Sequence, residues 1–132
     1  MLHHISFGVP DMERASTFYD AALTALGYVR VWEDLTPNDP HQAIGYGLPG
    51  GGDKFCIKLT AERLTVPWAG FHLAFAAPNR QAVVLFHQAG IVAGGRDNGA
   101  PGLRPHYGEN YFASYLNDPN GYHLEAICKS AE

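Results

Sequence analysis

The sequence predicts an α+β domain that contains two copies of a βαβββ module. The chain repeats itself at an offset of 68 residues, the separation of His4 and His72. Each copy begins with an alternating apolar run, a helix-capping residue and a helical apolar spacing. The 15 Gly and 9 Pro indicate the many turns of a sheet-rich fold. We expect one domain over 1–132, with a first module over 1–60, a linker over 61–70 and a second module over 71–129.

Composition and charge exclude several classes of protein. With 46% apolar and 17% charged residues, the chain is neither disordered nor a coiled coil. Its net charge of −4 includes no run of like charges, so we expect no nucleic-acid partner and no membrane partner. No apolar stretch reaches the ~18 residues of a transmembrane span. Cys56 and Cys128 are too few for a disulfide framework and no signal peptide is recognisable, so we expect a cytoplasmic protein.

The repeat is clearest at the beginning of the two modules. Residues 4–27 and 72–95 share seven identities, where average composition would produce about one or two. The identical pairs are His4 and His72, Phe7 and Phe75, Pro10 and Pro78, Phe18 and Phe86, Ala21 and Ala89, Ala25 and Ala93, and Gly27 and Gly95. The two histidines therefore occupy equivalent positions in the first strand of each module.

The first module is expected to begin with a half-buried strand, because Ile5, Phe7 and Val9 alternate with other residues. Asp11 caps the following helix, and Gly27 ends it in a left-handed conformation. The apolar face of the helix consists of Ala15, Phe18, Tyr19, Ala22 and Leu23. Three further strands are expected over 28–33, 42–47 and 54–60.

The second module repeats this order. A strand around Leu73 and Phe75 precedes Asn79, which caps a helix that we expect to end at Gly90. The apolar face of this helix consists of Ala82, Val83, Phe86 and Ala89. Further strands are expected over 91–93, 111–116 and 122–128. The segment 94–110 is expected to be a long loop, which in a compact domain is either functional or mobile.

Strand alternation decides which side chains share the sheet face turned away from the helices. That face receives His4 and His72 from the first strands of the modules, and Lys58 and Glu125 from the last strands. Two neutral imidazoles and one carboxylate form the facial triad that suits Fe(II), with Mn, Ni and Zn as alternatives. His4, His72 and Glu125 are therefore the candidate ligands of a divalent metal, with positions left open for a substrate.

These features resemble the vicinal oxygen chelate superfamily, which includes glyoxalase I, the bleomycin resistance proteins and the extradiol dioxygenases. The resemblance rests on the paired βαβββ modules, on His4 and His72, and on Asp-Pro-Asn-Gly at 118–121 ahead of the strand that bears Glu125. It implies that the modules form an open barrel around a metal bound by these three residues. It also implies a small-molecule substrate and a site completed between modules or across a homodimer.

One departure from the resemblance concerns Lys58. At the matching position glyoxalase I has a carboxylate that binds the metal and takes part in proton transfer. A charged lysine cannot bind a metal, so glyoxalase I activity itself is disfavoured. Lys58 is instead a candidate catalytic residue, either as a neutral base or as a charged group that holds a substrate oxyanion.

The C-terminal part of the chain resembles the extradiol dioxygenase signature in its spacing, with departures at Arg104 and Ser114. By this resemblance, His106 and Tyr115 bind substrate or move protons and are candidate catalytic residues. The turn at 118–121 is expected to place Tyr115 opposite Glu125 on one sheet face.

Three further residues are candidates for substrate binding. Tyr107 and Tyr111 are suited to an aromatic pocket wall. Arg104 is either a clamp for a carboxylate or phosphate of the substrate or a solvated loop residue.

Two functions remain open at this point. The first is a glyoxalase- or dioxygenase-like metalloenzyme, in which the ion binds two oxygens of a small substrate. The second is a metal-free binding protein that sequesters a small molecule, with Lys58 and Glu125 neutralising each other as a buried ion pair.

Overall fold

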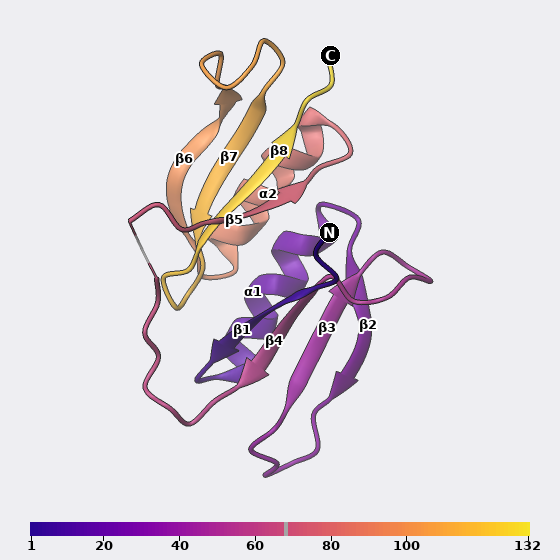
Figure 1. Ribbon diagram of the computed structural model, residues 1–132, viewed down its shortest axis with the longest axis vertical. Coiled ribbons are helices and arrows are strands. Elements are labelled where there is room, and N and C mark those ends of the chain that lie inside the picture. Colours follow the sequence, from indigo (N-terminus) through magenta and orange to yellow (C-terminus); the bar gives the residue numbers. More distant parts are fainter. Residues whose placement is uncertain (68) are drawn as a thin grey trace.

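The computed structural model describes residues 1–67 and 69–132, and it contains two four-stranded mixed sheets, each with one helix behind it (Figure 1). Residue 68 belongs to the predicted linker and lies outside the described residues. The first sheet has the order β1-β4-β3-β2 and the second the order β5-β8-β7-β6. The elements of the first module are β1 (Ile5–Val9), α1 (Met12–Thr24), β2 (Val29–Asp34), β3 (Ala43–Gly47) and β4 (Phe55–Leu59). Those of the second are β5 (Leu73–Ala76), α2 (Arg80–Val92), β6 (Arg96–Leu103), β7 (Phe112–Asn117) and β8 (His123–Cys128). The predicted α+β class with two βαβββ modules is confirmed.

The two helices begin where their capping residues predict. The Asp11 carboxylate accepts a hydrogen bond from the backbone N–H of Arg14 at 3.0 Å, and the Asn79 side chain accepts one from Ala82 at 2.8 Å. Each bond satisfies a backbone donor that has no partner inside the helix. Gly27 ends the first helical segment with a φ of +88°, as expected.

The end of α2 differs from the prediction. Gly90 lies inside the helix, which continues to Val92, so the strand expected over 91–93 is helical. The left-handed glycine that follows α2 is Gly94, with a φ of +107°. A Cβ at Gly90 would collide with the side chain of Leu116. Glycine at position 90 therefore permits close packing of the helix on the sheet, rather than ending the helix.

About half of the segment expected to be a long loop, residues 96–103, is the edge strand β6. It pairs with β7, but the register shifts between Asp97 and Gly99 and again between Gly99 and Gly102. These irregularities interrupt the alternation of apolar residues. The sequence over 94–110 therefore lacks the pattern by which a strand is recognised.

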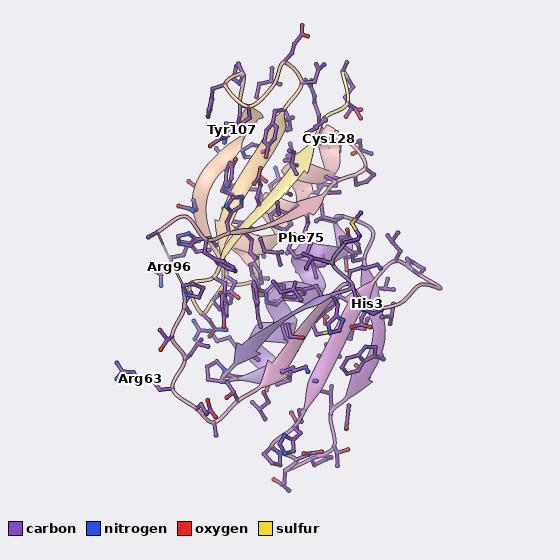
Figure 2. The ribbon with its side chains drawn as sticks, viewed as in Figure 1. His3, Arg63, Phe75, Arg96, Tyr107 and Cys128 are labelled. Carbon is purple, nitrogen blue, oxygen red and sulfur yellow. The ribbon has the colours of Figure 1, made fainter. Side chains whose placement is uncertain are left out.

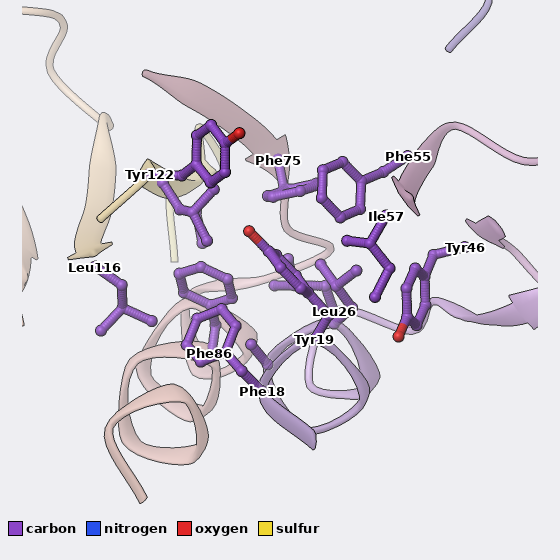
Figure 3. Packing of buried hydrophobic residues seen from close by; sticks show 14 of the residues in the cluster. Phe18, Tyr19, Leu26, Tyr46, Phe55, Ile57, Phe75, Phe86, Leu116 and Tyr122 are labelled. Atoms are coloured by element: carbon purple, nitrogen blue, oxygen red, sulfur yellow. The ribbon is translucent and has the colours of Figure 1, made fainter. Parts of the chain in front are cut away.

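One hydrophobic core joins the two modules (Figure 3). Phe7 of the first module stacks on Tyr122 of the second with ring centroids 4.1 Å apart, and the Tyr122 hydroxyl donates to the backbone oxygen of Gly8 at 3.1 Å. Phe55 and Phe75 meet edge to face at 5.6 Å. Burial of each such side chain contributes roughly 1.5–3 kcal/mol. The shared core fixes the two sheets relative to one another.

The strands β1 and β5 lie along the boundary between the modules and run in opposite directions (Figure 1). The beginning of β1 is therefore near the end of β5, and the beginning of β5 is near the end of β1. The two sheets do not close into a barrel. In the part of the chain that the structure describes, no helix is long and apolar enough to span a membrane.

Candidate functional site

The face of each sheet turned away from its helix is called here the open face. In the second module, Leu124 and Ala126 pack into the core, so Glu125 between them lies on the open face. Tyr115 of β7 is the register partner of Glu125, as the sequence predicts.

The turn before β8 produces this register. The backbone N–H of Gly121 donates to the carbonyl of Asp118 at 2.9 Å, and Gly121 has a φ of +95°, which favours glycine. The Asp118 carboxylate accepts further hydrogen bonds from the backbone N–H groups of Asn120 and Tyr122. The hydroxyl of Tyr19 on α1 also donates to Asp118, at 2.5 Å. The turn is therefore held by its own backbone and by the other module.

Glu125 lies at the centre of the open face of the second module and is only 1% exposed. The hydroxyls of Tyr111 and Tyr115 donate to its Oε1 at 2.6 and 3.2 Å. Its Oε2 lies 2.9 Å from Nε2 of His72, whose side chain is 48% exposed. One oxygen of the carboxylate is thus oriented by two phenols, and the other faces an imidazole that solvent can reach.

The two phenols remain protonated at neutral pH. Burial raises the pKa of Tyr111 well above its usual value of 10, and the hydrogen bond to Glu125 raises it further. Burial, followed by the charge of Glu125, raises the pKa of Tyr115 to about 12. Both hydroxyls are therefore hydrogen-bond donors that hold the carboxylate in place.

The residues predicted to bind substrate lie next to Glu125 or next to its tyrosine neighbours. The guanidinium of Arg104 lies 5.5 Å from the ring of Tyr115 and donates to the backbone oxygen of Ala100 at 2.6 Å. Tyr107 and Tyr111 have ring centroids 5.2 Å apart. They line a pocket of about 240 Å³ with Lys129, whose Nζ lies 5.9 Å from the Tyr111 ring.

His106 lies at the exposed rim of this group. Its ring centroid is 4.1 Å from that of Tyr107, which Figure 2 labels in the upper module. Arg104, Tyr107, Tyr111 and Tyr115 are therefore neighbours of Glu125 or of one another, whereas His106 faces solvent.

The structure places His4 apart from His72. Each histidine directly precedes the edge strand of its own module, and those strands run in opposite directions (Figure 1). Nδ1 of His4 lies 2.8 Å from Nδ1 of His3, which Figure 2 labels in the lower module. Within residues 1–67 and 69–132, no three His, Cys, Asp or Glu side chains are close enough to hold one metal ion. His72 and Glu125 are thus brought together, and His4 is not.

The strand register also reassigns a position in the first module. Glu125 pairs with Ala74, whose counterpart at the offset of 68 is Ser6, and Ser6 pairs with Cys56. Cys56 is therefore the residue equivalent to Glu125. The sequence analysis assigned this place to Lys58, which pairs with Gly8 and is exposed. Both residues lie on the open face, since a shift of two residues leaves the face unchanged, and only the register separates them.

Sequence reasoning also missed Asp53, which precedes β4. The thiol of Cys56 donates to Oδ2 of Asp53 at 2.9 Å. This hydrogen bond lowers the pKa of the Asp53 carboxyl, and the nearby His4 lowers it further. Burial raises the pKa of the Cys56 thiol to about 12, and Asp53 raises it too. Strand alternation places Cys56 on the same face as Lys58, but no motif in the sequence marks it as a functional residue.

The donors of the second module fit a divalent ion. Two ligands at right angles on an ion, each with a bond of about 2.1 Å, lie about 3 Å apart. Nε2 of His72 and Oε2 of Glu125 are 2.9 Å apart. The phenols behind Glu125 are the outer partners that usually orient such a carboxylate ligand. The spacing of His72 and Glu125 is therefore compatible with two neighbouring ligands of one ion.

Comparison with known proteins gives matches among solved structures. No family model and no curated protein match the chain. A glyoxalase/bleomycin resistance protein from Albidiferax ferrireducens T118 is 29% identical over 96% of both chains, with a TM-score of 0.72. A glyoxalase-related enzyme from Fulvimarina pelagi is 21% identical over 96% of this chain and 86% of that one, with a TM-score of 0.69. A glyoxalase/bleomycin resistance protein/dioxygenase family enzyme from Burkholderia phytofirmans PsJN is 18% identical over 96% and 97% of the two chains, with a TM-score of 0.65.

Proposed function

We propose that this chain, which belongs to the vicinal oxygen chelate superfamily, binds a small oxygen-bearing molecule at a divalent metal held by His72 and Glu125. The observation that carries the proposal is the contact of 2.9 Å between Nε2 of His72 and Oε2 of Glu125. Glu125 is buried and its second oxygen is held by Tyr111 and Tyr115. A carboxylate fixed in this way, beside an accessible imidazole, is organised as a ligand pair.

The residues around the pair have separate roles in this proposal. The bound ion would supply Lewis acidity toward two neighbouring oxygens of the substrate. Tyr111 and Tyr115 keep the carboxylate of Glu125 in one orientation. Imidazole and carboxylate donors suit Fe(II), Mn(II), Ni(II) and Zn(II).

We propose that the substrate lies beside Glu125, on the side of the β6–β7 connection. Tyr107 and Tyr111 form an aromatic wall, and Arg104 binds a carboxylate or phosphate group of the substrate. Tyr115 donates its one hydroxyl proton to Glu125, so toward the substrate its phenol oxygen is a hydrogen-bond acceptor. His106 at the rim exchanges protons with solvent. Lys58, exposed on the open face of the first module, holds an oxyanion of the substrate rather than the metal.

A second copy of the chain is proposed to complete the site. Within the described residues, no three His, Cys, Asp or Glu side chains are close enough to hold one ion, so one chain does not bring His4 together with His72 and Glu125. In a symmetric dimer, His4 of one copy would meet His72 and Glu125 of the other, and two equivalent sites would form. Cys56 and Cys128 are both free thiols, which supports a reducing compartment such as the cytoplasm.

A metal-free binding protein is the second candidate function. Glu125 already has three partners in the absence of an ion, namely Tyr111, Tyr115 and His72. A pocket of this kind could sequester a small molecule without chemistry. The ion pair between Lys58 and Glu125 that the sequence suggested for this case does not form, because Lys58 is exposed on the other sheet.

Metal titration of stripped protein tests the proposal. We expect saturable binding of Fe(II) under anaerobic conditions, and of Mn(II), Ni(II) or Zn(II), with one ion per chain and strong weakening in His72→Ala. The matched control is His41→Ala, an exposed histidine of the β2–β3 connection, which should bind like the wild type. Equal binding by the wild type and His72→Ala would reject this site. Absence of metal binding by the wild type would favour the sequestering function.

A further inference from the structure

A hollow of about 190 Å³ opens where the two modules meet, and it is called here the boundary pocket. Ile5 of β1 and Phe55 of β4 line it from the first module, and Leu73 and Phe75 of β5 line it from the second. Residues 2–4 also belong to its wall, and Figure 2 labels His3 among them and Phe75 across the boundary. The volume equals that of about six water molecules at ~30 Å³ each, so the pocket suits a small molecule.

The inner wall of the boundary pocket is formed by aromatic rings of the shared core. Phe55 and Phe75 meet edge to face with their centroids 5.6 Å apart, and Tyr28 is tilted against Phe75 at 6.1 Å. A second cavity of about 10 Å³ shares these three rings with the pocket. The hollow thus reaches the core, and an apolar group bound in it would be removed from water against apolar side chains.

The boundary pocket also carries a cation and a phenol. Lys54 lines both cavities and belongs to none of the ion pairs found among the described residues. The carboxylate of its neighbour Asp53 accepts a hydrogen bond from the thiol of Cys56 at 2.9 Å. Burial raises the pKa of Tyr28, so its hydroxyl keeps its proton at neutral pH and can donate a hydrogen bond. The wall therefore combines apolar surface with groups that bind an anion.

We propose that the boundary pocket binds a small monocarboxylate with an apolar body, of the size of an aromatic acid or a short fatty acid. The carboxylate pairs with Lys54 and accepts a hydrogen bond from Tyr28, and the apolar body lies against Phe55 and Phe75. Because the walls belong to both modules, the ligand contacts both and stabilises their arrangement.

Nuclear magnetic resonance titration of the full-length, metal-free protein tests the proposal. Benzoate and hexanoate should each shift the backbone amide signals of Ile5, Lys54, Phe55 and Leu73, and the shifts should saturate with a Kd below ~1 mM. Acetate lacks the apolar body and benzamide lacks the charge. Each should therefore bind at least roughly tenfold more weakly than benzoate, because each loses one of the two interactions.

Variants of Lys54 separate its charge from its bulk. Lys54 is exposed, so Lys54→Gln should leave the fold intact and weaken benzoate binding by roughly tenfold or more. Lys54→Arg should restore most of the affinity, and Tyr28→Phe should cause a smaller loss than Lys54→Gln. The matched control is Arg63→Gln, which removes an exposed cation of the linker far from the pocket (Figure 2) and should bind benzoate like the wild type.

Three results would overturn the proposal. The first is the absence of a saturable shift at the residues of the boundary pocket. The second is equal affinity of the wild type for benzoate and benzamide, or of the wild type and Lys54→Gln for benzoate. The third is a set of shifts confined to Arg104, Tyr107 and Lys129, which would place the anion on the second module instead.

The boundary pocket and the proposed metal site can fail independently. Neither His72 nor Glu125 lines the pocket, and the titration with benzoate is carried out without a metal ion. His72→Ala should therefore bind benzoate like the wild type, whatever its effect on metal binding. Loss of benzoate binding in this variant would contradict a separate site.

Discussion

At the scale of single residues, the environment of Glu125 explains how the carboxylate that we propose as a metal ligand can be buried. Burial of a charged group is costly unless hydrogen bonds compensate it. Here Tyr111 and Tyr115 supply two charge-assisted bonds to Oε1, and Oε2 remains directed toward His72. The two phenols are not equivalent, because the bond from Tyr111 is 2.6 Å long and that from Tyr115 is 3.2 Å long.

Removal of each phenol should therefore have a different effect. Tyr111→Phe leaves Oε1 with its longer bond only, so we expect metal affinity to fall by roughly tenfold and the free energy of unfolding to fall by about 1–3 kcal/mol. Tyr115→Phe should have a smaller effect on both quantities. Calorimetric metal titration and urea denaturation of the two variants measure this. Equal losses in both variants, or a larger loss in Tyr115→Phe, would contradict the asymmetry of the two bonds.

At the scale of elements, the contact between α1 and the turn before β8 links the two modules. The hydroxyl of Tyr19 donates to Asp118, and Asp118 holds the backbone of the turn that sets the register of Tyr115 with Glu125. Tyr19 is fully buried. Its pKa is raised well above the usual value of 10 by burial, and then by the charge of Asp118.

The raised pKa of Tyr19 predicts alkaline destabilisation. The folded state keeps this proton at a pH where the unfolded chain loses it, so its contribution to stability is constant below about pH 10 and falls as pH rises above that value. The expected slope is about 1.4 kcal/mol per pH unit for one proton. Urea denaturation from about pH 8 to pH 11 should show a smaller slope for Tyr19→Phe than for the wild type. Identical slopes in the two proteins would show that Tyr19 is not responsible, whatever the offset in stability.

At the scale of the whole molecule, the candidate ligand His4 of the first module does not join His72 and Glu125 of the second within one chain. The shared core holds the modules in a fixed arrangement through contacts such as Phe7 on Tyr122. The antiparallel β1 and β5 then keep the beginning of one strand away from the beginning of the other. In the proposed function, a rigid chain of this kind would bring His4 to His72 and Glu125 only with a second copy.

A mixing experiment tests this arrangement. His4→Ala and His72→Ala should each bind Co(II) weakly as homodimers, because every site lacks one ligand. After random exchange of subunits, about half of the dimers contain both variants, and each of these has one intact site, so binding should return to ~25% of the wild-type sites. Titration of the mixture at stoichiometric concentrations measures the recovery, and sedimentation confirms the dimer. A mixture that behaves as the average of the two variants would place the site within one chain.

Local sequence patterns were sufficient to predict both helices, most strands and the faces of those strands. The repeat, the caps at Asp11 and Asn79 and the strand alternation predict the helices, most of the strands and the open face that carries Glu125, because each is a local property of a few neighbouring residues. The turn at 118–121 similarly predicts the pairing of Tyr115 with Glu125. The edge strand β6 was not predicted, because its register shifts interrupt the alternation of apolar residues by which a strand is recognised.

The strand register of β4 and the placement of the two modules became known only from the three-dimensional contacts. Cys56 and Lys58 share a face, so alternation cannot distinguish them, and the hydrogen-bonded ladder with β1 is needed to place Cys56 opposite Ser6. The separation of His4 from His72 depends on the relative direction of β1 and β5, which follows from packing of the shared core. Local periodicity contains no information on either quantity, because both arise from contacts between residues far apart in the chain.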